Sequence, residues 1–128
     1  MIDRGDLGTV FEDGECIVCQ GEQGECMYVI QKGKVEVVVE TAGGKMRLNV
    51  LEAGEVFGEM ALFTHEPRSA TVRALGQARV LTIDKRGFLK RVHQDPSLAF
   101  RILQKLSERV RSLNEEIVRL KGRPGSDL

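Results

Sequence analysis

The sequence predicts a mainly β fold that is followed by C-terminal helices. From Gly8 to Val80, short apolar segments alternate with polar residues and are separated by glycine turns. After Ile83 the apolar residues recur at helical spacing instead. Many short strands at this spacing are typical of an antiparallel jelly roll or barrel.

The composition describes one soluble globular domain. The 128 residues are enough for one hydrophobic core, and 41% are hydrophobic and 30% charged. The formal net charge is zero, from 19 basic and 19 acidic residues, so we expect no direct binding of nucleic acid. No apolar run is long enough to span a bilayer, and the first residues lack the apolar region of a signal peptide. We therefore expect a cytoplasmic protein with no membrane partner.

The expected strands are defined by β-forming residues between glycine turns. In the segment 45–51, Met46, Leu48 and Val50 alternate with polar neighbours, which predicts that they share one face. Turns are expected at residues 13–14, 31–34 and 42–44, and a break at Gly76. The expected strands are residues 9–11, 16–19, 26–30, 35–39, 45–51, 70–75 and 78–83.

Three cysteines, Cys16, Cys19 and Cys26, lie within eleven residues. An odd number argues against a disulfide framework, and a closed zinc or iron–sulfur site usually needs four ligands. On a regular strand, Cys16 and Cys19 would point to opposite faces. We interpret the three as buried thiols that act as small hydrophobic residues, and we expect no metal and no cofactor.

The stretch 57–72 carries the chemistry of the chain. Gly58 lets the backbone approach a ligand closely, and residues 60–63 can form one helical turn whose first N–H groups suit an anion. Ten residues later, Arg68 offers a planar fork of donors for two phosphate oxygens. Glu59 would repel a phosphate, so we expect it to accept from a sugar hydroxyl. The set fits one phosphate fused to a ribose; the alternative is that Glu59 and Arg68 only pair with each other on a surface loop.

The pattern Phe-Gly-Glu-x-Ala-Leu, then Pro-Arg-Ser-Ala-Thr-Val, resembles the phosphate-binding cassette of cyclic nucleotide-binding domains. Such domains occur in bacterial catabolite activator proteins, cyclic-nucleotide-dependent protein kinases and cyclic-nucleotide-gated channels. The resemblance extends from about Leu7 to Leu120. It implies a double-stranded β-helix (jelly roll) with the cassette as its helical interruption, and a sensor of cAMP in preference to cGMP. The alternatives are the same fold sensing another small ligand, or the regulatory fragment of a larger transcription factor, channel or kinase.

The resemblance also implies a role for individual residues. In the cassette, Glu59 would bind the ribose 2′-hydroxyl and Arg68 a phosphate oxygen. Gly58 and Met60 would place backbone atoms near the cyclic phosphate, and Phe57 and Ala61 would complete this part of the binding site. Ser69 and Ala70 would supply further hydrogen-bond donors. The base would pack against Leu48 and Val72, stack on Arg109 and pair with Asn114.

Two helices are expected after the strands. Asp84 can cap the first, over residues 85–93, and Asp95 the second, with Pro96 in its first position. The second helix carries an a/d heptad seam, which favours a parallel homodimer through residues 99–120, with Glu116 and Lys121 attracting across it. The alternative is an amphipathic helix that packs on its own β-roll. The seam consists of Leu103, Leu106, Val110, Leu113, Ile117 and Leu120.

We expect one domain overall, made of three parts. Residues 1–94 form the β-roll with the cassette and the first helix, residues 95–121 the long helix, and residues 122–128 a disordered tail. No Ser-His-Asp or Cys-His arrangement is apparent in the sequence, so we expect no enzyme.

Overall fold

A computed structural model describes residues 7–64 and 66–121. The chain divides into two compact units, Met1–Phe88 and Leu89–Leu128, and each is described here by itself. The division into 1–94, 95–121 and 122–128 stays a prediction, and the tail lies outside the described residues. The elements are β1 (Thr9–Phe11), β2 (Cys16–Val18), β3 (Met27–Thr41), β4 (Gly44–Glu52), β5 (Val56–Phe57), α1 (Met60–Phe63), β6 (Thr71–Ile83), α2 (Lys85–Gln94) and α3 (Ser97–Lys121).

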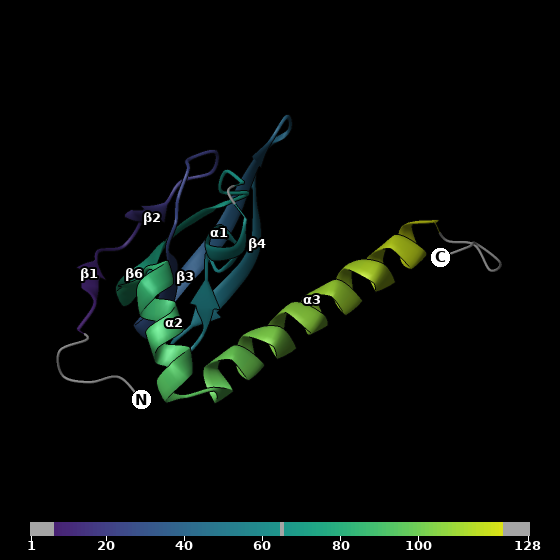
Figure 1. Cartoon of the computed structure of the whole chain (residues 1–128). Helices are drawn as coiled ribbons and strands as arrows, with labels where there is room; N and C mark the ends of the chain where they lie inside the picture. The colour runs from purple at the N-terminus through teal and green to yellow at the C-terminus, as the bar shows by residue number, and fades with distance from the viewer. Residues whose placement is uncertain (1–6, 65, 122–128) are drawn as a thin grey trace. The chain divides into compact units, whose positions relative to one another are not determined.

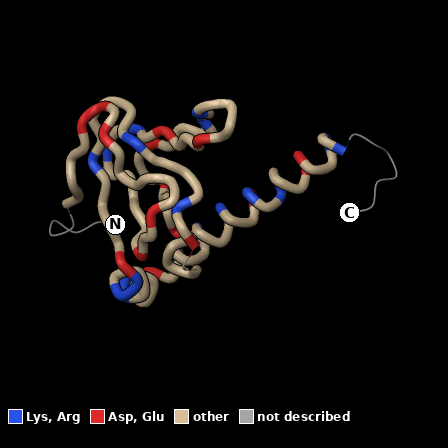
Figure 2. The backbone as a smooth tube through the Cα atoms, turned by 90° about the horizontal axis from the view of Figure 1, so that it is seen from above, with Lys and Arg blue, Asp and Glu red and all other residues tan. Residues whose placement is uncertain are grey.

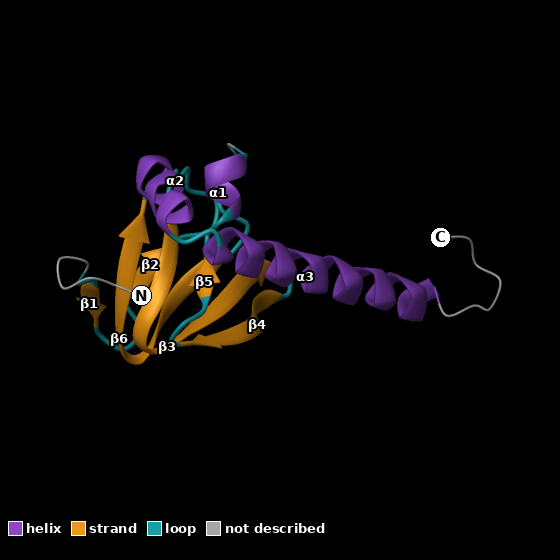
Figure 3. Cartoon of the chain, turned by 60° about the horizontal axis from the view of Figure 1, so that its bottom comes forward, coloured by secondary structure: helices purple, strands orange, loops and turns teal. Residues whose placement is uncertain are grey.

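The described strands form one antiparallel sheet (Figure 1). Its order is β1-β6-β3-β4, with β2 also paired to β6 and β5 also paired to β3. The two long strands β3 and β6 lie beside each other and carry the shorter ones, as Figure 3 shows in orange. The predicted jelly roll with one short helical interruption and C-terminal helices is therefore confirmed.

Two predicted interruptions of the strands are wrong, because the chain continues through them. Residues 31–34 lie inside β3, and Gly76 lies inside β6. Gly33 has a φ of 86° and Gly76 a φ of 75°, and the register between the strands shifts on both sides of Lys32. A Cβ at Gly33 would overlap the carbonyl oxygen of Gln77. Each glycine thus produces a local kink in a continuing strand, where the sequence pattern indicated a reversal.

A β-bulge in β4 overturns the predicted alternation of Met46, Leu48 and Val50. Arg47 pairs with Val38 and Asn49 with Val37, so Leu48 is an extra residue between two register pairs. A bulge reverses the faces that follow it. Leu51, after the bulge, is the residue of β4 that is buried, whereas Met46 and Leu48 are more than half exposed.

A second bulge lies in β2 and corrects the interpretation of the cysteines. Cys16 pairs with Arg73 and Val18 with Val72, so Ile17 is the extra residue. Ile17 and Val18 both pack on the core, whereas Cys16 is exposed. Cys19 therefore returns to the face of Cys16, and the expectation of opposite faces is wrong. Cys19 and Cys26 are only half-buried, so none of the three is a fully buried thiol.

The hydrophobic core lies between the long strands and the segments that pack on them. Burial of apolar side chains is the main contribution to its stability. Its buried members are Val18, Ile30, Val35, Leu51, Phe57, Val72, Ala74, Ala78 and Val80, with Phe11, Ile17, Tyr28 and Val37 packed against them.

Both C-terminal helices begin with an aspartate cap. The Asp84 carboxylate accepts from the Gly87 N–H at 2.7 Å, which confirms the cap of α2. The Asp95 carboxylate accepts from the Ser97 hydroxyl at 2.6 Å and from its N–H at 3.2 Å, and these bonds hold the pKa of Asp95 below its usual range. α3 begins one residue later than predicted, at Ser97 instead of Pro96.

The heptad residues of α3 lie on exposed positions. Figure 2 shows basic residues and fewer acidic residues spread along the helix. Glu116 forms an ion pair with Arg119 one turn away, at 3.2 Å, so it already has a partner within its own helix. No helix in the described part of the chain is both long and apolar enough to cross a membrane. Leu106 is half-buried, and the other heptad residues are 42–76% exposed: Leu103, Val110, Leu113, Ile117 and Leu120.

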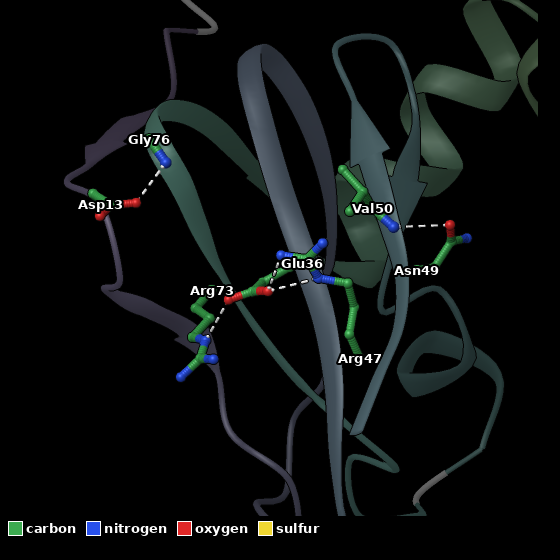
Figure 4. Close-up of polar contacts among 7 residues, drawn as sticks. All are labelled: Asp13, Glu36, Arg47, Asn49, Val50, Arg73 and Gly76. Carbon is green, nitrogen blue, oxygen red and sulfur yellow. Dashed lines mark hydrogen bonds and ion pairs between the residues drawn. The ribbon is translucent and has the colours of Figure 1, made fainter. Parts of the chain in front are cut away.

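Three charged side chains tie the central strands together across the sheet (Figure 4). The Glu36 carboxylate of β3 accepts from Arg73 of β6 at 2.8 Å, and it ion-pairs with Arg47 of β4 at 2.9 Å. Glu36 is only 12% exposed. Hydrogen bonds, first from Arg73 and then from Arg47, hold the pKa of Glu36 below its usual range.

We predict that Glu36→Gln lowers the free energy of unfolding by about 1 kcal/mol at neutral pH, because both arginines lose a charged acceptor. A lowered pKa means that the contribution is complete above the ordinary glutamate pKa and is lost as the pH falls through the lower, folded value. Urea unfolding from pH 7 to pH 3 should therefore show the variant and the wild type converging at acid pH. Glu40→Gln, at an exposed position of the same strand, is the control and should change little.

Candidate functional site

The cassette connects β5 to β6. β5 pairs with the start of β3, with Tyr28 opposite Phe57. α1 is a single turn in which Ala61 N–H donates to Gly58 and Leu62 N–H to Glu59, both at 3.1 Å. The predicted helical turn is confirmed, but these two N–H groups are engaged within it.

Gly58 is the point where the cassette backbone meets its arginine. Its φ of 74° is in the left-handed region that favours glycine. A Cβ at this position would lie 2.8 Å from Nη1 of Arg68 and 3.3 Å from the Tyr28 ring. The glycine is therefore required both by its conformation and by the close approach of the guanidinium.

The Arg68 side chain is held by backbone carbonyl groups from two segments. Nη1 donates to the Gly58 carbonyl at 3.3 Å, and Nη2 donates to the Cys26 carbonyl at 3.0 Å. The guanidinium also lies 5.6 Å from the centre of the Tyr28 ring, within cation–π range. A Cβ on Gly24 would overlap it as well. The two hydrogen bonds use two of the five N–H groups of a guanidinium.

The backbone of Arg68 is paired with the loop between β2 and β3. Its N–H donates to the Glu22 carbonyl, and its carbonyl accepts from the Gly21 N–H, both at 2.8 Å. Nearby, the Gln20 N–H donates to the Thr71 hydroxyl at 2.9 Å. Residues 20–24 thus fix the main chain of Arg68 as well as one side of its guanidinium.

An aromatic pair lies beneath the arginine. The rings of Tyr28 and Phe57 are stacked with centroids 5.0 Å apart. Burial raises the pKa of the Tyr28 hydroxyl, and the positive charge of Arg68 acts in the opposite direction. Tyr28 therefore gives the cation a neutral, polarisable neighbour.

Glu59 is buried, with 2% of its surface exposed. Burying a charge is costly, so such a residue needs specific interactions or a functional reason. With Arg68 half-buried as well, the two do not lie on the exposed surface loop that the alternative interpretation assumed.

The structure gathers part of the predicted site. Phe57, Gly58, Glu59 and Arg68 lie together at the end of β5. Met60 and Ser69 are exposed, Ala61 is buried and Ala70 half-buried. Val72 is buried in the core, whereas Leu48 is 56% exposed at its bulge. Arg109 and Asn114 belong to the second unit, so their part in a site stays a prediction.

Sequence reasoning missed the residues that support the arginine. Gly24, the Cys26 carbonyl and the Tyr28 ring all contact Arg68 from forty or more residues away. A glycine and the only tyrosine of the chain are weak signals, and a backbone acceptor has no sequence signal. Within the described residues, no group of three or more His, Cys, Asp or Glu side chains is arranged to hold a metal ion.

The sequence matches the family described as cyclic nucleotide-binding domain over residues 9–95, more than half of the chain. The chain belongs to the cyclic nucleotide-binding domain family. This confirms the resemblance seen in the cassette.

Three similar proteins illustrate the range of this family. The cAMP-dependent protein kinase regulatory subunit of Mucor circinelloides f. lusitanicus is 41% identical over 80 residues, which are 62% of this chain and 19% of that protein. The catabolite activator protein of Thermus thermophilus superposes with a TM-score of 0.82 at 28% identity, over 91% of this chain and 56% of that one. An EAL enzyme solved in a cAMP-bound form superposes with a TM-score of 0.62 at 33% identity, over 86% and 30%. This chain therefore spans between about a fifth and about a half of the length of these relatives.

We predict that Gly58→Ala weakens nucleotide binding at least ~10-fold, because the added Cβ displaces the Arg68 guanidinium and the positive φ costs about 1–2 kcal/mol. Gly54→Ala is the matched control, since Gly54 has a φ of 93° but nothing near its Cβ position. Calorimetric titration of both variants with cAMP separates the two effects. Equal affinities would show that the close approach at Gly58 is unimportant.

Proposed function

We propose that the chain is a cAMP sensor whose ligand binds at the cassette, with Arg68 on the cyclic phosphate and Glu59 on the ribose 2′-hydroxyl. The observation that carries this proposal is the fixed position of the Arg68 guanidinium beside Gly58. Two backbone carbonyls and an aromatic ring of the protein itself hold a cation there. Preorganised charge of this kind reduces the ordering cost of binding an anion.

The charges of the site fit a cyclic nucleotide better than a simple anion. Arg68 supplies a planar donor fork for phosphate oxygens. Glu59 would repel a free phosphate, but a carboxylate accepts from the hydroxyl that a ribose carries beside its cyclic phosphate. Family membership favours this ligand over the other small molecules that the fold could sense. The cAMP-dependent name of the Mucor relative supports adenine over guanine, whereas the EAL enzyme is solved in both a cAMP-bound and a cGMP-bound form and favours neither base.

A contact between α1 and α2 offers a route for the signal. The Phe63 ring at the end of α1 lies edge-on against Phe88 of α2, with centroids 5.9 Å apart. Phe88 is buried and Phe63 is about half exposed. Ligand binding that tightens the cassette would move Phe63 and so bias α2. Such a switch requires different affinities for two arrangements of this contact.

The output of the sensor belongs to a larger assembly or to a dimer. These three relatives are longer than the chain and contain this domain as one part. By analogy, the role of the chain is that of a regulatory part of a larger protein. We expect no catalysis by the cassette itself, because Glu59 and Arg68 suit the binding of a ribose hydroxyl and a phosphate better than acid–base chemistry. His65 lies outside the described residues.

We predict that Arg68→Ala weakens cAMP binding by roughly 10- to 150-fold, the effect of removing a charged hydrogen-bond partner worth about 1.5–3 kcal/mol. Titration calorimetry of the wild type should give a lower Kd for cAMP than for cGMP. Arg47→Ala, which removes an exposed arginine of β4, is the control and should bind as the wild type does. Absence of binding of either nucleotide at millimolar concentration would contradict the proposal.

The exposed heptad stripe of α3 supports a homodimer. Its apolar side chains recur at a and d positions from Leu103 to Leu120 and most are more than half exposed. In a parallel coiled coil each would enter a hole between residues of the second copy. Asn114 and Arg109 flank the stripe, at e and g positions, and the resemblance to the family implies that they contact the base.

We predict that Leu113→Glu converts the protein from dimer to monomer, because like charges would face each other at a d position. Ser112→Glu adds the same charge beside the stripe and should leave the dimer intact. Sedimentation velocity over a range of concentrations distinguishes the two states. A wild type that stays monomeric at high micromolar concentration would instead favour packing of α3 within its own chain.

A further inference from the structure

Cys16 and Cys19 lie on one side of β2, as a consequence of its bulge. The extra residue, Ile17, turns with Val18 toward the core and leaves both cysteines on the opposite side. Partial burial raises the pKa of the Cys19 thiol, and a side-chain hydrogen bond with Cys16 raises it further. Cys16 is exposed and Cys19 half-buried, so a small molecule from solvent can reach Cys16.

From this arrangement we propose that Cys16 and Cys19 form a reversible disulfide, and that this disulfide weakens nucleotide binding by displacing Arg68. The first part concerns the chemistry of the two thiols alone. The second part rests on the proposed function of the cassette.

The oxidant is a small-molecule disulfide such as oxidised glutathione. The Cys16 thiolate attacks one sulfur of the oxidant, which forms a mixed disulfide and releases one glutathione thiolate. The Cys19 thiolate then attacks the Cys16 sulfur, which closes the protein disulfide and releases the second glutathione. The two protein thiols lose two electrons and two protons, and both appear in two molecules of reduced glutathione.

The positions of the two cysteines fit these roles. Cys16 is the exposed thiol, so a soluble oxidant reaches it before it reaches the half-buried Cys19. The raised pKa of Cys19 makes it the slower nucleophile, which suits the second, intramolecular step. A strained or exposed disulfide is readily reduced again, so a bond between these two cysteines is reversible.

The loop that follows Cys19 is the support of the cassette arginine. The Cys19 carbonyl accepts from the Glu22 N–H at 3.2 Å, and the Glu22 carbonyl accepts from the Arg68 N–H at 2.8 Å. Gly21 completes the pairing, and Gly24 packs against the guanidinium. A disulfide that draws Cys19 toward Cys16 therefore pulls on the segment that fixes Arg68. The expected result is a weaker alignment of the phosphate-binding cation.

The disulfide is tested first, without nucleotide. The full chain is equilibrated with oxidised or reduced glutathione, alkylated and digested with a protease that cleaves after glutamate. Cleavage after Glu15 and Glu22 yields one peptide, residues 16–22, that contains Cys16 and Cys19 but not Cys26. We expect this peptide to be two hydrogens lighter and protected from alkylation after oxidation. If both cysteines are alkylated under every condition, the proposal is wrong.

The coupling to the cassette is tested by two measurements on the same samples. Oxidation should weaken cAMP binding by roughly 5- to 50-fold, within the usual range of coupling between sites. It should also speed amide hydrogen exchange in residues 20–24 and 68–71. Unchanged or tighter binding, or unchanged exchange, overturns the coupling.

Cysteine variants serve as matched controls. Cys16→Ser and Cys16→Ala should both abolish the response to oxidation and keep the affinity of the reduced wild type for cAMP. If the reduced wild type binds no nucleotide, the proposed function fails, but the peptide mass and the hydrogen exchange still decide whether the disulfide forms and moves the loop. The two failures are therefore distinguishable.

Discussion

The pair of hydrogen bonds from Arg68 to the Gly58 and Cys26 carbonyls is the interaction on which the site depends. It joins the cassette to the start of β3, and it works only because Gly58 has no side chain. The stacked rings of Tyr28 and Phe57 align β5 with β3, so that the two carbonyls face one guanidinium. The core of the β-roll thereby determines the position of a charge at its edge. Binding of an anion there would need little rearrangement of the protein.

The cassette could be predicted from the sequence because its chemistry is local. Gly58, Glu59 and the helical turn are neighbours in the chain, and Arg68 follows in a short, stiff segment. The supports of Arg68 could not be predicted, since they come from residues 21–28 and act largely through backbone atoms. The seam of α3 could likewise be predicted, because its apolar residues repeat regularly. The element that packs against this seam could not be predicted, because the repeat describes only one side of the contact.

The errors in strand prediction share a cause, which is that sequence alternation assumes regular pairing. Glycine usually marks turns, so the sequence pattern predicts strand ends at Gly33 and Gly76, yet these residues allow β3 and β6 to kink and continue. At Leu48 and Ile17, one extra residue reverses the faces of the strand. Such an insertion depends on the partner strand, so it leaves no trace in local periodicity. The same reversal is what places Cys16 and Cys19 together.

The bulge at Leu48 has a consequence for the behaviour of the protein in concentrated solution. β4 lies at one end of the sheet order and exposes the apolar side chains of Met46 and Leu48. A flat edge strand with such side chains would readily pair with a strand of another copy. Regular edges recruit additional strands and so promote aggregation. The extra residue interrupts the even spacing of N–H and carbonyl groups that a docking strand would need. The irregularity thus disfavours fibre-like growth at this edge.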